Sequence, residues 1–316
     1  MKRREFLRSS ILTTAFLSMG GYSLANVDSK FKTKTDWPKR DDNWKYMGKK
    51  DTSSVKREKE YVFDVAVIGG GVAGLCAAVS AARHGAKTVL VQNRSVLGGN
   101  ASSEIHVPIN GSYHFKNKFG VDRETGIVEE IQLENRYYNV QNSWEVWDHV
   151  MYDYVTRQEN LTLMLNTQAM EAVMDGNSIK KAICFQMSTE SKIIINADIF
   201  IDCSGDGALA ASAGAEYRSG REGKAEFNEK YAPDEPDGWV MGDSIQFSSK
   251  DMGYPVPFNP PSFTIKYDPS KANKRTITQL SCGFWWVELG SDLDIVDVTD
   301  LTTMIFTNSI LKSCDE

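Results

Sequence analysis

The sequence has few cysteines, and their spacing favours neither a disulfide framework nor a metal site. Five occur among 316 residues, and none belongs to a Cys-x-x-Cys pair. This spacing predicts no zinc site and no iron–sulfur cluster, and an odd number of cysteines completes no disulfide framework. The motifs Gly-x-Ser-x-Gly and His-Glu-x-x-His are also missing, so the sequence carries no signature of an α/β-hydrolase or of a zinc peptidase.

Positive charge is scarce as well. The chain has 36 Lys and Arg against 42 Asp and Glu, a net charge of −6 and a pI near 5.4. This balance argues against a nucleic-acid partner, which would need a basic surface. Hydrophobic residues make up 41% of the sequence and charged residues 25%. Composition and length together predict a globular protein with a large core and two domains.

Basic residues gather instead at the N-terminus. The chain starts Met-Lys-Arg-Arg-Glu-Phe-Leu-Arg, continues with a mildly apolar stretch and reaches small residues at Ser23-Leu24-Ala25. This is the order of regions in a secretory signal peptide, and Arg3-Arg4-Glu5-Phe6-Leu7 resembles the twin-arginine export signal. The apolar stretch is too short and too rich in Ser, Thr and Gly for a stable membrane span. We expect residues 1–25 to direct export by the twin-arginine machinery into the periplasm and then to be removed; the alternative is a disordered basic tail.

A β-α-β pattern follows further along the chain. Residues 61–68 are apolar and rich in Val, which predicts a buried strand. A helix of small residues is predicted over 72–84, and a second apolar strand over 88–91. Between the first strand and the helix, three glycines have the spacing G-x-G-x-x-G: Gly69, Gly71 and Gly74.

These glycines predict a dinucleotide-binding turn, because each has a physical role in one. Gly69 permits the tight turn, Gly71 lets a pyrophosphate approach the backbone, and Gly74 lets the helix pack closely on the strand. The phosphates then meet the unpaired N–H groups of the first helical residues, Val72 and Ala73. The alternative is a purely structural glycine turn. The place where an Asp or Glu usually binds the ribose holds two amides, which bind hydroxyls without the charge: Gln92 and Asn93.

A second glycine pair lies just after the second strand, in Leu97-Gly98-Gly99-Asn100-Ala101-Ser102-Ser103. The run from Gly69 to Glu104 resembles the N-terminal FAD-binding segment of the FAD-dependent oxidoreductase family, which is related to fumarate-reductase-type flavoproteins and to the flavin subunit of heterodisulfide reductase. The resemblance covers residues 61–300. Asp202-Cys203-Ser204-Gly205-Asp206-Gly207 is similar to the D-A-T-G-D-G element of that family, and Gly283-Phe284-Trp285-Trp286-Val287-Glu288 is a third mark.

The resemblance implies FAD as the cofactor and assigns further contacts to it. Along the phosphates and the ribityl chain it places Gly98, Gly99 and Asn100. It brings Gly205 and Asp206 close to the FAD; the alternative for Asp206 is the N-cap of the helix that follows. Near the adenine it places the start of a β-hairpin, at Gln168 and Ala169.

The remaining pattern predicts the other elements of this domain. Two amphipathic helices are predicted over 125–135 and 144–156, with aromatic side chains that are more typical of core than of ligand stacking. Strands are predicted over 161–165, 169–174, 179–186, 192–195 and 197–203, the last one buried. After residue 218 the prolines cluster, and short alternating stretches such as 244–247 and 262–266 predict a sheet-rich cap domain.

Candidate catalytic residues are fewer. By the resemblance, the segment after the second glycine pair passes near the flavin ring, so His106 and His114 are the nearest acid–base candidates. The alternative is that both are ordinary loop or surface histidines. Trp285, Trp286 and Glu288 are candidates for lining a polar, sugar-like substrate; the alternative is that the tryptophans belong to the core.

The sequence thus predicts an α/β protein: an FAD-type Rossmann domain with a parallel sheet and β-hairpin crossover, plus a β-rich cap or substrate domain. The expected organisation is a signal peptide (1–25), a polar linker (26–58), the FAD domain (59–217) and the cap domain (218–316). The expected function is hydride transfer from a small polar substrate to flavin, with an unidentified electron acceptor.

The family's C-terminal strand–Gly–helix element is not found in residues 218–316, so we expect a C-terminally shortened chain. This leaves a second hypothesis, an FAD-binding protein that is catalytically incomplete and has a structural or sensory role or needs another chain.

Overall fold

The computed structural model of this chain describes residues 57–109, 124–250, 252–254, 257, 262, 277–281 and 284–291. The chain divides into two compact units, Met1–Val55 and Lys56–Glu316, and the described residues all belong to the second. The predicted signal peptide, most of the predicted linker and His114 therefore lie outside the described residues. Within the described ranges, no helix has both the length and the apolar composition that a membrane crossing needs.

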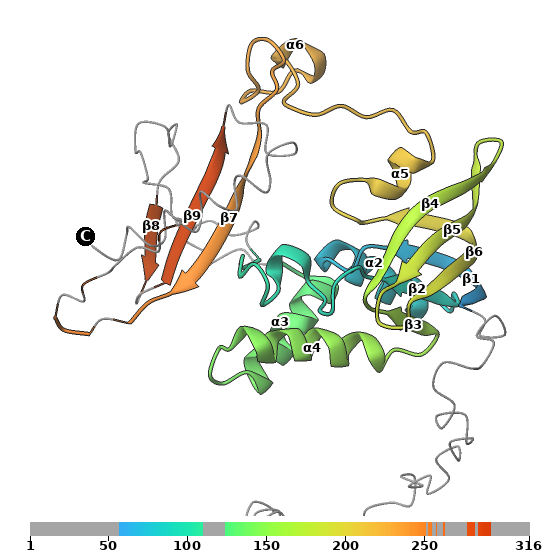
Figure 1. The fold of residues 1–316 in the computed structure, drawn as a ribbon, viewed down its shortest axis with the longest axis horizontal. Coiled ribbons are helices and arrows are strands. Elements are labelled where there is room, and N and C mark those ends of the chain that lie inside the picture. The colour runs from blue at the N-terminus through green and yellow to red at the C-terminus, as the bar shows by residue number, and fades with distance from the viewer. Residues whose placement is uncertain are drawn as a thin grey trace, which may run out of the picture. The chain divides into compact units, whose positions relative to one another are not determined.

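Six strands form one mixed sheet in the order β3-β2-β1-β6-β5-β4 (Figure 1). Their bounds are β1 Glu58–Ile68, β2 Thr88–Val91, β3 Leu161–Met164, β4 Thr167–Asp175, β5 Ser178–Gln186 and β6 Ser191–Asp202. The pairs β3–β2, β2–β1 and β1–β6 are parallel, whereas β6–β5 and β5–β4 are antiparallel. This confirms the predicted α/β class, with a parallel sheet that a β-hairpin extends at one edge.

The sheet has a hydrophobic core on each face, and the central strand β1 contributes to both. Val65 and Val67 pack in the core that contains side chains of α2 (Val72–Arg83), α3 (Gly126–Tyr138) and α4 (Trp144–Thr156). Ala66 and Ile68 point to the opposite core, which includes Leu209 of α5 (Ala208–Ser212). Because alternate residues of a strand face opposite sides, a segment buried on both sides is apolar throughout, as residues Val65–Ile68 of β1 are.

The long strand β6 differs from its prediction. We expected two strands over 192–195 and 197–203, but Ser191–Asp202 forms a single strand. Asn196 does not interrupt it, because its side-chain amide donates hydrogen bonds to Glu60 Oε1 (2.9 Å) and to the carbonyl oxygen of Tyr61 (3.1 Å). The second half is also less buried than predicted, since the side chain of Ile199 is 57% exposed. The polar residue inside the strand is therefore satisfied by the neighbouring strand β1.

A second, three-stranded antiparallel sheet has the order β7-β9-β8, built from β7 Val240–Ser248, β9 Phe284–Ser291 and β8 Ile277–Ser281. A single-turn helix, α6 (Lys224–Phe227), precedes it. Sheet structure was predicted here, with 244–247 falling within β7, whereas the predicted strand at 262–266 lies outside the described residues. The boundary between an FAD domain and a cap domain at residue 218 stays a prediction.

Candidate functional site

A cavity of about 970 Å³ lies at the carboxyl ends of β1, β2 and β6. This is the edge of a parallel sheet where α/β proteins bind ligands, and the volume is in the range of cofactor sites, roughly 300–1,000 Å³. Its lining includes nearly all residues that the sequence predicted for the cofactor: Gly69, Gly71, Val72, Ala73, Gln92, Asn93, Gly98, Gly99, Asn100, Ala169, Gly205 and Asp206. The structure thus brings together residues from four separate stretches of the sequence.

The first glycine loop is packed tightly against backbone atoms of the protein. Gly69 has φ +101°, and a Cβ there would lie 2.1 Å from the carbonyl oxygen of Cys203. Gly74 is not in the cavity lining; a Cβ there would lie 1.8 Å from the carbonyl oxygen of Gly69, so the helix packs directly on the turn. By contrast, no heavy atom lies within 4 Å of a Cβ built on Gly71. Gly69 and Gly74 are required by the protein's own packing, whereas the space at Gly71 is open to a ligand.

Helix α2 presents its N-terminus to this open space. Its N-cap is Gly71, which has no side chain to bond the first N–H groups, and its first turn carries no acidic residue. Val72 and Ala73 of that turn line the cavity. Unpaired N–H groups and the positive end of the helix dipole favour an anion here.

The second glycine loop lies beside the first. Gly98 pairs with Gly71 in an isolated parallel bridge, and its N–H donates to the carbonyl oxygen of Gly70 at 2.8 Å. Gly98 and Gly99 have φ of +103° and +59°, the left-handed region that glycine adopts readily. A Cβ on Gly99 would lie 3.4 Å from the Cα of Gly71. The two glycine loops therefore form one continuous wall of bare backbone, starting at the N-terminus of α2 and continuing into the short 3₁₀ helix η4 (Gly99–Ala101).

Side chains of helix α4 hold the second glycine loop in place. The sequence analysis did not predict these contacts. Trp147 Nε1 donates to the carbonyl oxygen of Ala101 at 2.6 Å, and the backbone N–H of Ser103 donates to Asp148 Oδ1 at 3.0 Å. One turn further, Met151 Cε lies 2.7 Å from the position of a Cβ on Gly98. Three side chains of one helix thus fix a loop that lies more than forty residues earlier in the sequence.

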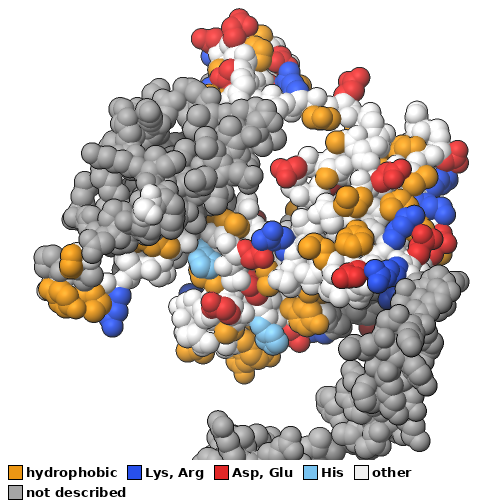
Figure 2. Space-filling view, in the orientation of Figure 1, with side chains coloured by type: hydrophobic (Ala, Val, Ile, Leu, Met, Phe, Trp, Pro, Cys, Tyr) orange, Lys and Arg blue, Asp and Glu red, His pale blue; other side chains and the backbone are white. Residues whose placement is uncertain are grey.

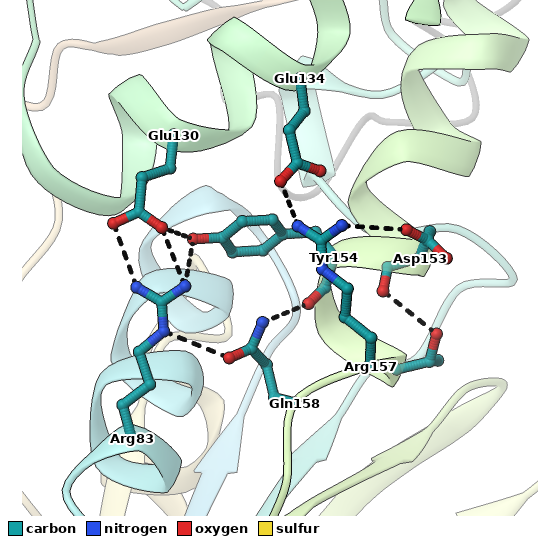
Figure 3. Close-up of polar contacts among 8 residues, drawn as sticks. Arg83, Glu130, Glu134, Asp153, Tyr154, Arg157 and Gln158 are labelled. Carbon is teal, nitrogen blue, oxygen red and sulfur yellow. Dashed lines mark hydrogen bonds and ion pairs between the residues drawn. The ribbon is translucent and has the colours of Figure 1, made fainter.

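A polar cluster joins α4 in turn to α2 and α3 (Figure 3). Tyr154, which is 1% exposed, donates its hydroxyl to Glu130 Oε2 at 2.6 Å and accepts from Arg83 Nη2 at 2.9 Å. Arg83 also pairs with both carboxylate oxygens of Glu130, and the guanidinium of Arg157 stacks over the Tyr154 ring at 4.9 Å. Burial, and next the hydrogen bond to Glu130, raise the pKa of Tyr154, so its hydroxyl stays protonated and donates. The cluster connects the helices that hold the two glycine loops.

The side chain of Gln92, which was predicted to bind the ribose, makes hydrogen bonds within the protein. It is 4% exposed, and its side-chain amide bonds two loops of the protein itself: Oε1 accepts from the N–H of Gly70 at 2.8 Å, and Nε2 donates to the carbonyl oxygen of Val96 at 3.0 Å. One lone pair and one N–H of the amide are left for a ligand. The predicted ribose contact by Gln92 and Asn93 therefore stays a prediction, while the role of Gln92 in joining the glycine loops is visible.

The turn after β6 is held by Asp202 rather than by Asp206. Asp202 Oδ1 accepts from the N–H of Ser204 at 2.9 Å, and Oδ2 accepts from the N–H of Ala210 at 2.8 Å. Burial alone would raise the pKa of Asp202, but the hydrogen bonds that Ser204 and the helix backbone donate lower it, so the carboxylate stays charged. The N-cap of α5 is Gly207, so the alternative role of Asp206 as N-cap is wrong. The side chain of Asp206 is exposed at the cavity.

The predicted catalytic residues are less closely joined to the cavity. His106 has φ +66° and stacks on the indole of Trp144, with ring centroids 5.1 Å apart. Its neighbours Ile105 and Val107 line the cavity, whereas His106 is not among the lining residues. Glu288 lies in β9, opposite Ser244 in the pairing with β7, and its side chain is outside the described residues. Catalytic roles for both residues stay predictions.

The tryptophans of β9 are held within their own sheet. Trp286 Nε1 donates to Ser244 Oγ at 3.0 Å, and Trp285 Nε1 donates to Ser249 Oγ at 2.8 Å. Trp285 also stacks on Phe247, with ring centroids 6.3 Å apart. These contacts favour the structural alternative for both rings over direct substrate contact.

Several cavity residues were not assigned by the sequence. They include Arg94, Glu104, Thr167, Cys203 and Ser204. Arg94 Nε pairs with Glu104 Oε2 at 2.8 Å across the loop that follows β2. Burial, and then the charge of Asp202, raise the pKa of the Cys203 thiol, so it is neutral near pH 7 and unsuited to act as a nucleophile. No group of metal-ligating side chains occurs among the residues with described positions.

Comparison with known proteins identifies the family of this chain. A family model described as FAD dependent oxidoreductase matches residues 64–303. Among curated proteins, the soluble pyridine nucleotide transhydrogenase of Hahella chejuensis is 40% identical over 55 residues, which span 17% of this chain and 12% of that protein. The matched part of the transhydrogenase is thus a small fraction of its length.

Solved structures resemble this chain more distantly. A geranylgeranyl bacteriochlorophyll reductase-like protein from Thermoplasma acidophilum is 15% identical with a TM-score of 0.39, covering 79% of this chain and 62% of the other. A myxobacterial FAD-dependent chondrochloren halogenase is 11% identical with a TM-score of 0.41, covering 79% and 59%. Because the TM-scores are below 0.5, these likenesses carry no functional argument. The function is inferred from the family match and from the residues of the site.

Proposed function

We propose, from the premise that this chain belongs to the FAD dependent oxidoreductase family, that it oxidises a small polar, carbohydrate-like molecule by hydride transfer to bound FAD. The observation that carries this proposal is the wall formed by the two glycine loops. It joins Gly71 to Gly98 at the N-terminus of α2, and it lines a cavity at the carboxyl ends of the parallel strands.

FAD is the cofactor of the family, and the described cavity fits it. The N–H groups of Val72 and Ala73 would bind phosphate oxygens at the open space beside Gly71. The bare backbone of Gly98, Gly99 and Asn100 would admit the chain between the phosphates and the ring, and Ala169, which also lines the cavity, is the candidate contact for the adenine. When bound, FAD supplies the acceptor for the substrate's hydride.

The protein's own share is to bind, orient and exchange a proton. His106 is the candidate for taking the proton of the substrate hydroxyl, because the residues on either side of it line the cavity. Imidazole is the side chain that most often performs such proton transfers. Glu288 is the second candidate.

The first test is the absorption spectrum of the purified chain, followed by identification of what heat denaturation releases. We expect flavin bands and released FAD. Anaerobic addition of sugars and polyols should then bleach the flavin band. A colourless protein that takes up no added FAD would contradict the proposal, whereas a bound flavin that no substrate reduces would favour the catalytically incomplete alternative.

We also propose export by the twin-arginine machinery, which the order of regions in residues 1–25 supports. Changing both Arg3 and Arg4 to Lys should keep the protein in the cytoplasmic fraction, while the same change at Arg8, outside the pair, should leave export intact. Equal export of both variants would exclude this route.

A further inference from the structure

A second, smaller pocket of about 220 Å³ lies between α3, α4 and the loop after the second glycine pair. Its polar lining comes from Gln132 and Asn135 of α3 and from three residues between α3 and α4, Asn139, Asn142 and Ser143. Its aromatic lining is Trp144 and Trp147. It shares the residues Ala101, Pro108 and Ile109 with the larger cavity. A ligand in this pocket would therefore lie next to the proposed FAD site.

The polar groups of the pocket are neutral, and several are available for a ligand. Among its described lining residues there is no charged side chain. The side-chain amides of Gln132 and Asn142 have no hydrogen-bond partner within the described part of the chain. Asn135 accepts from Asn139 Nδ2 at 2.9 Å through its Oδ1, which leaves its own amide N–H groups. Carboxamides both donate and accept, as hydroxyl groups require.

The aromatic side adds a flat apolar surface. Trp147 is buried, and its indole N–H is already bound to Ala101, so it presents ring carbon to its surroundings. Trp144 is half-buried and is held on one side by the imidazole of His106. Indole rings provide large rigid contact area at small entropic cost, and they suit the C–H faces of a compact ring.

We infer that this pocket binds a neutral, hydroxyl-rich ring such as a hexose or a cyclitol, as the subsite for the substrate of the oxidoreductase. The assignment as substrate subsite rests on the proposed function. An anionic sugar is disfavoured, because burying a charge without a partner is costly, and the described lining offers no cation. The volume is below that of drug-sized sites and suits a single ring.

Calorimetric titration of the FAD-loaded full chain tests this inference. The probes are D-glucose and myo-inositol, with D-glucuronate as the charged comparison. We expect saturable binding of at least one neutral ring and, for glucuronate, an affinity about tenfold or more lower than for that ring. Binding of glucuronate as tight as that of the neutral rings would overturn the inference, and so would the absence of any saturable binding.

Two variants remove pocket amides without strain. Gln132→Leu keeps a good helix former, and Asn142→Gly suits the φ of +52° at that position. Each should lower the affinity for the neutral ring about fivefold, because one hydrogen bond to the ligand is lost. Gln141→Leu is the matched control, an exposed neighbour that should leave affinity unchanged. If the pocket variants bind as the wild type does, the pocket is not the subsite.

The flavin content of the same samples distinguishes a failure of the sugar subsite from a failure of the proposed function. Protein that holds FAD but binds no neutral ring refutes the subsite and leaves the oxidoreductase intact. If the protein takes up no FAD, the proposed function fails; the sugar titration of this cofactor-free protein still decides the pocket, because its walls come from the chain itself.

Discussion

The two glycine loops meet in one wall, but they are fixed in different ways. The glycines from Gly69 to Gly74 follow from a local strand–turn–helix pattern, in which a Cβ on Gly74 would strike the backbone of Gly69, although Gly69 also packs against Cys203. The loop from Gly98 to Ser103 is fixed by side chains of α4, a distant helix. The first loop can therefore be recognised from local sequence, whereas the second depends on tertiary structure. Variants in each loop and in α4 test this difference.

Gly74→Ala should have the largest effect. The added methyl would lie 1.8 Å from the carbonyl oxygen of Gly69, which is backbone and cannot turn away as a side chain can. We expect a loss of about 3 kcal/mol or more in the free energy of unfolding, with loss of soluble protein if the margin is small. Thermal unfolding measures it, and a melting temperature equal to that of the wild type would contradict the close packing of α2 on β1.

Gly71→Ala should affect the ligand and spare the fold. Gly71 has φ −62° and ψ 176°, which alanine adopts readily, and its Cβ would meet no atom of the protein. Stability should stay within about 0.5 kcal/mol, while FAD affinity falls about tenfold or more because the methyl takes the space of a phosphate. Equal FAD affinity for this variant would place the phosphates elsewhere.

Asp148→Ala tests the hold of α4 on the second loop. The change leaves the N–H of Ser103 without its partner, at a cost of about 1–3 kcal/mol if water does not replace it. FAD affinity should fall several-fold, because Gly98 and Gly99 lose their support. The exposed neighbour His149→Ala is the matched control. If both variants bind FAD equally, the loop keeps its shape without α4.

The same distinction explains how much of the molecule the sequence predicts. The strand Thr88–Val91 and the helix Trp144–Thr156 occur as expected, because each has a clear period and a clear end. Strand β6 was divided wrongly at Asn196, because a polar residue inside a strand looks like a break unless its partner Glu60 is known. Local periodicity reports a segment's own preference and does not report a bond to another strand.

The site shows the same limit. Its glycines follow from spacing and from family resemblance, since bare backbone at a helix N-terminus is a local requirement. The internal bonds of Gln92 and the hydrogen bonds by which Asp202 holds the turn after β6 were not predictable, since each depends on segments brought together by the fold. The same holds for the support that Trp147 and Asp148 give to the second loop.

Tyr154→Phe should have a smaller effect on the link between α4 and α2. The hydroxyl bonds to both Glu130 and Arg83, but these two stay paired with each other at 2.8 Å when it is removed. We therefore expect a loss of about 1 kcal/mol in unfolding free energy and little change in FAD affinity. Tyr152→Phe, at a ring that is 45% exposed, is the control that should change neither. A loss as large as that of Asp148→Ala would show that the cluster itself supports the second loop.

The smallest expected effect is the pH dependence of the stability that the Arg83–Glu130–Tyr154 cluster contributes. The hydrogen bond from Arg83, and next that from Tyr154, lower the pKa of Glu130 in the folded protein. A carboxyl whose folded pKa is lowered stabilises the fold above its unfolded pKa, near 4.3, and this contribution disappears as the pH falls through the folded pKa. Because the Glu130 side chain is 46% exposed, solvent screens the pair, and the effect stays below about 1 kcal/mol. In urea unfolding, Glu130→Gln should therefore be less stable than the wild type at pH 7, and the difference should shrink as the pH falls. Glu159→Gln, at an exposed position after α4, should match the wild type throughout. A stability difference for Glu130→Gln that persists unchanged at low pH would assign it to shape rather than charge, and would leave α2 and α4 joined by packing alone.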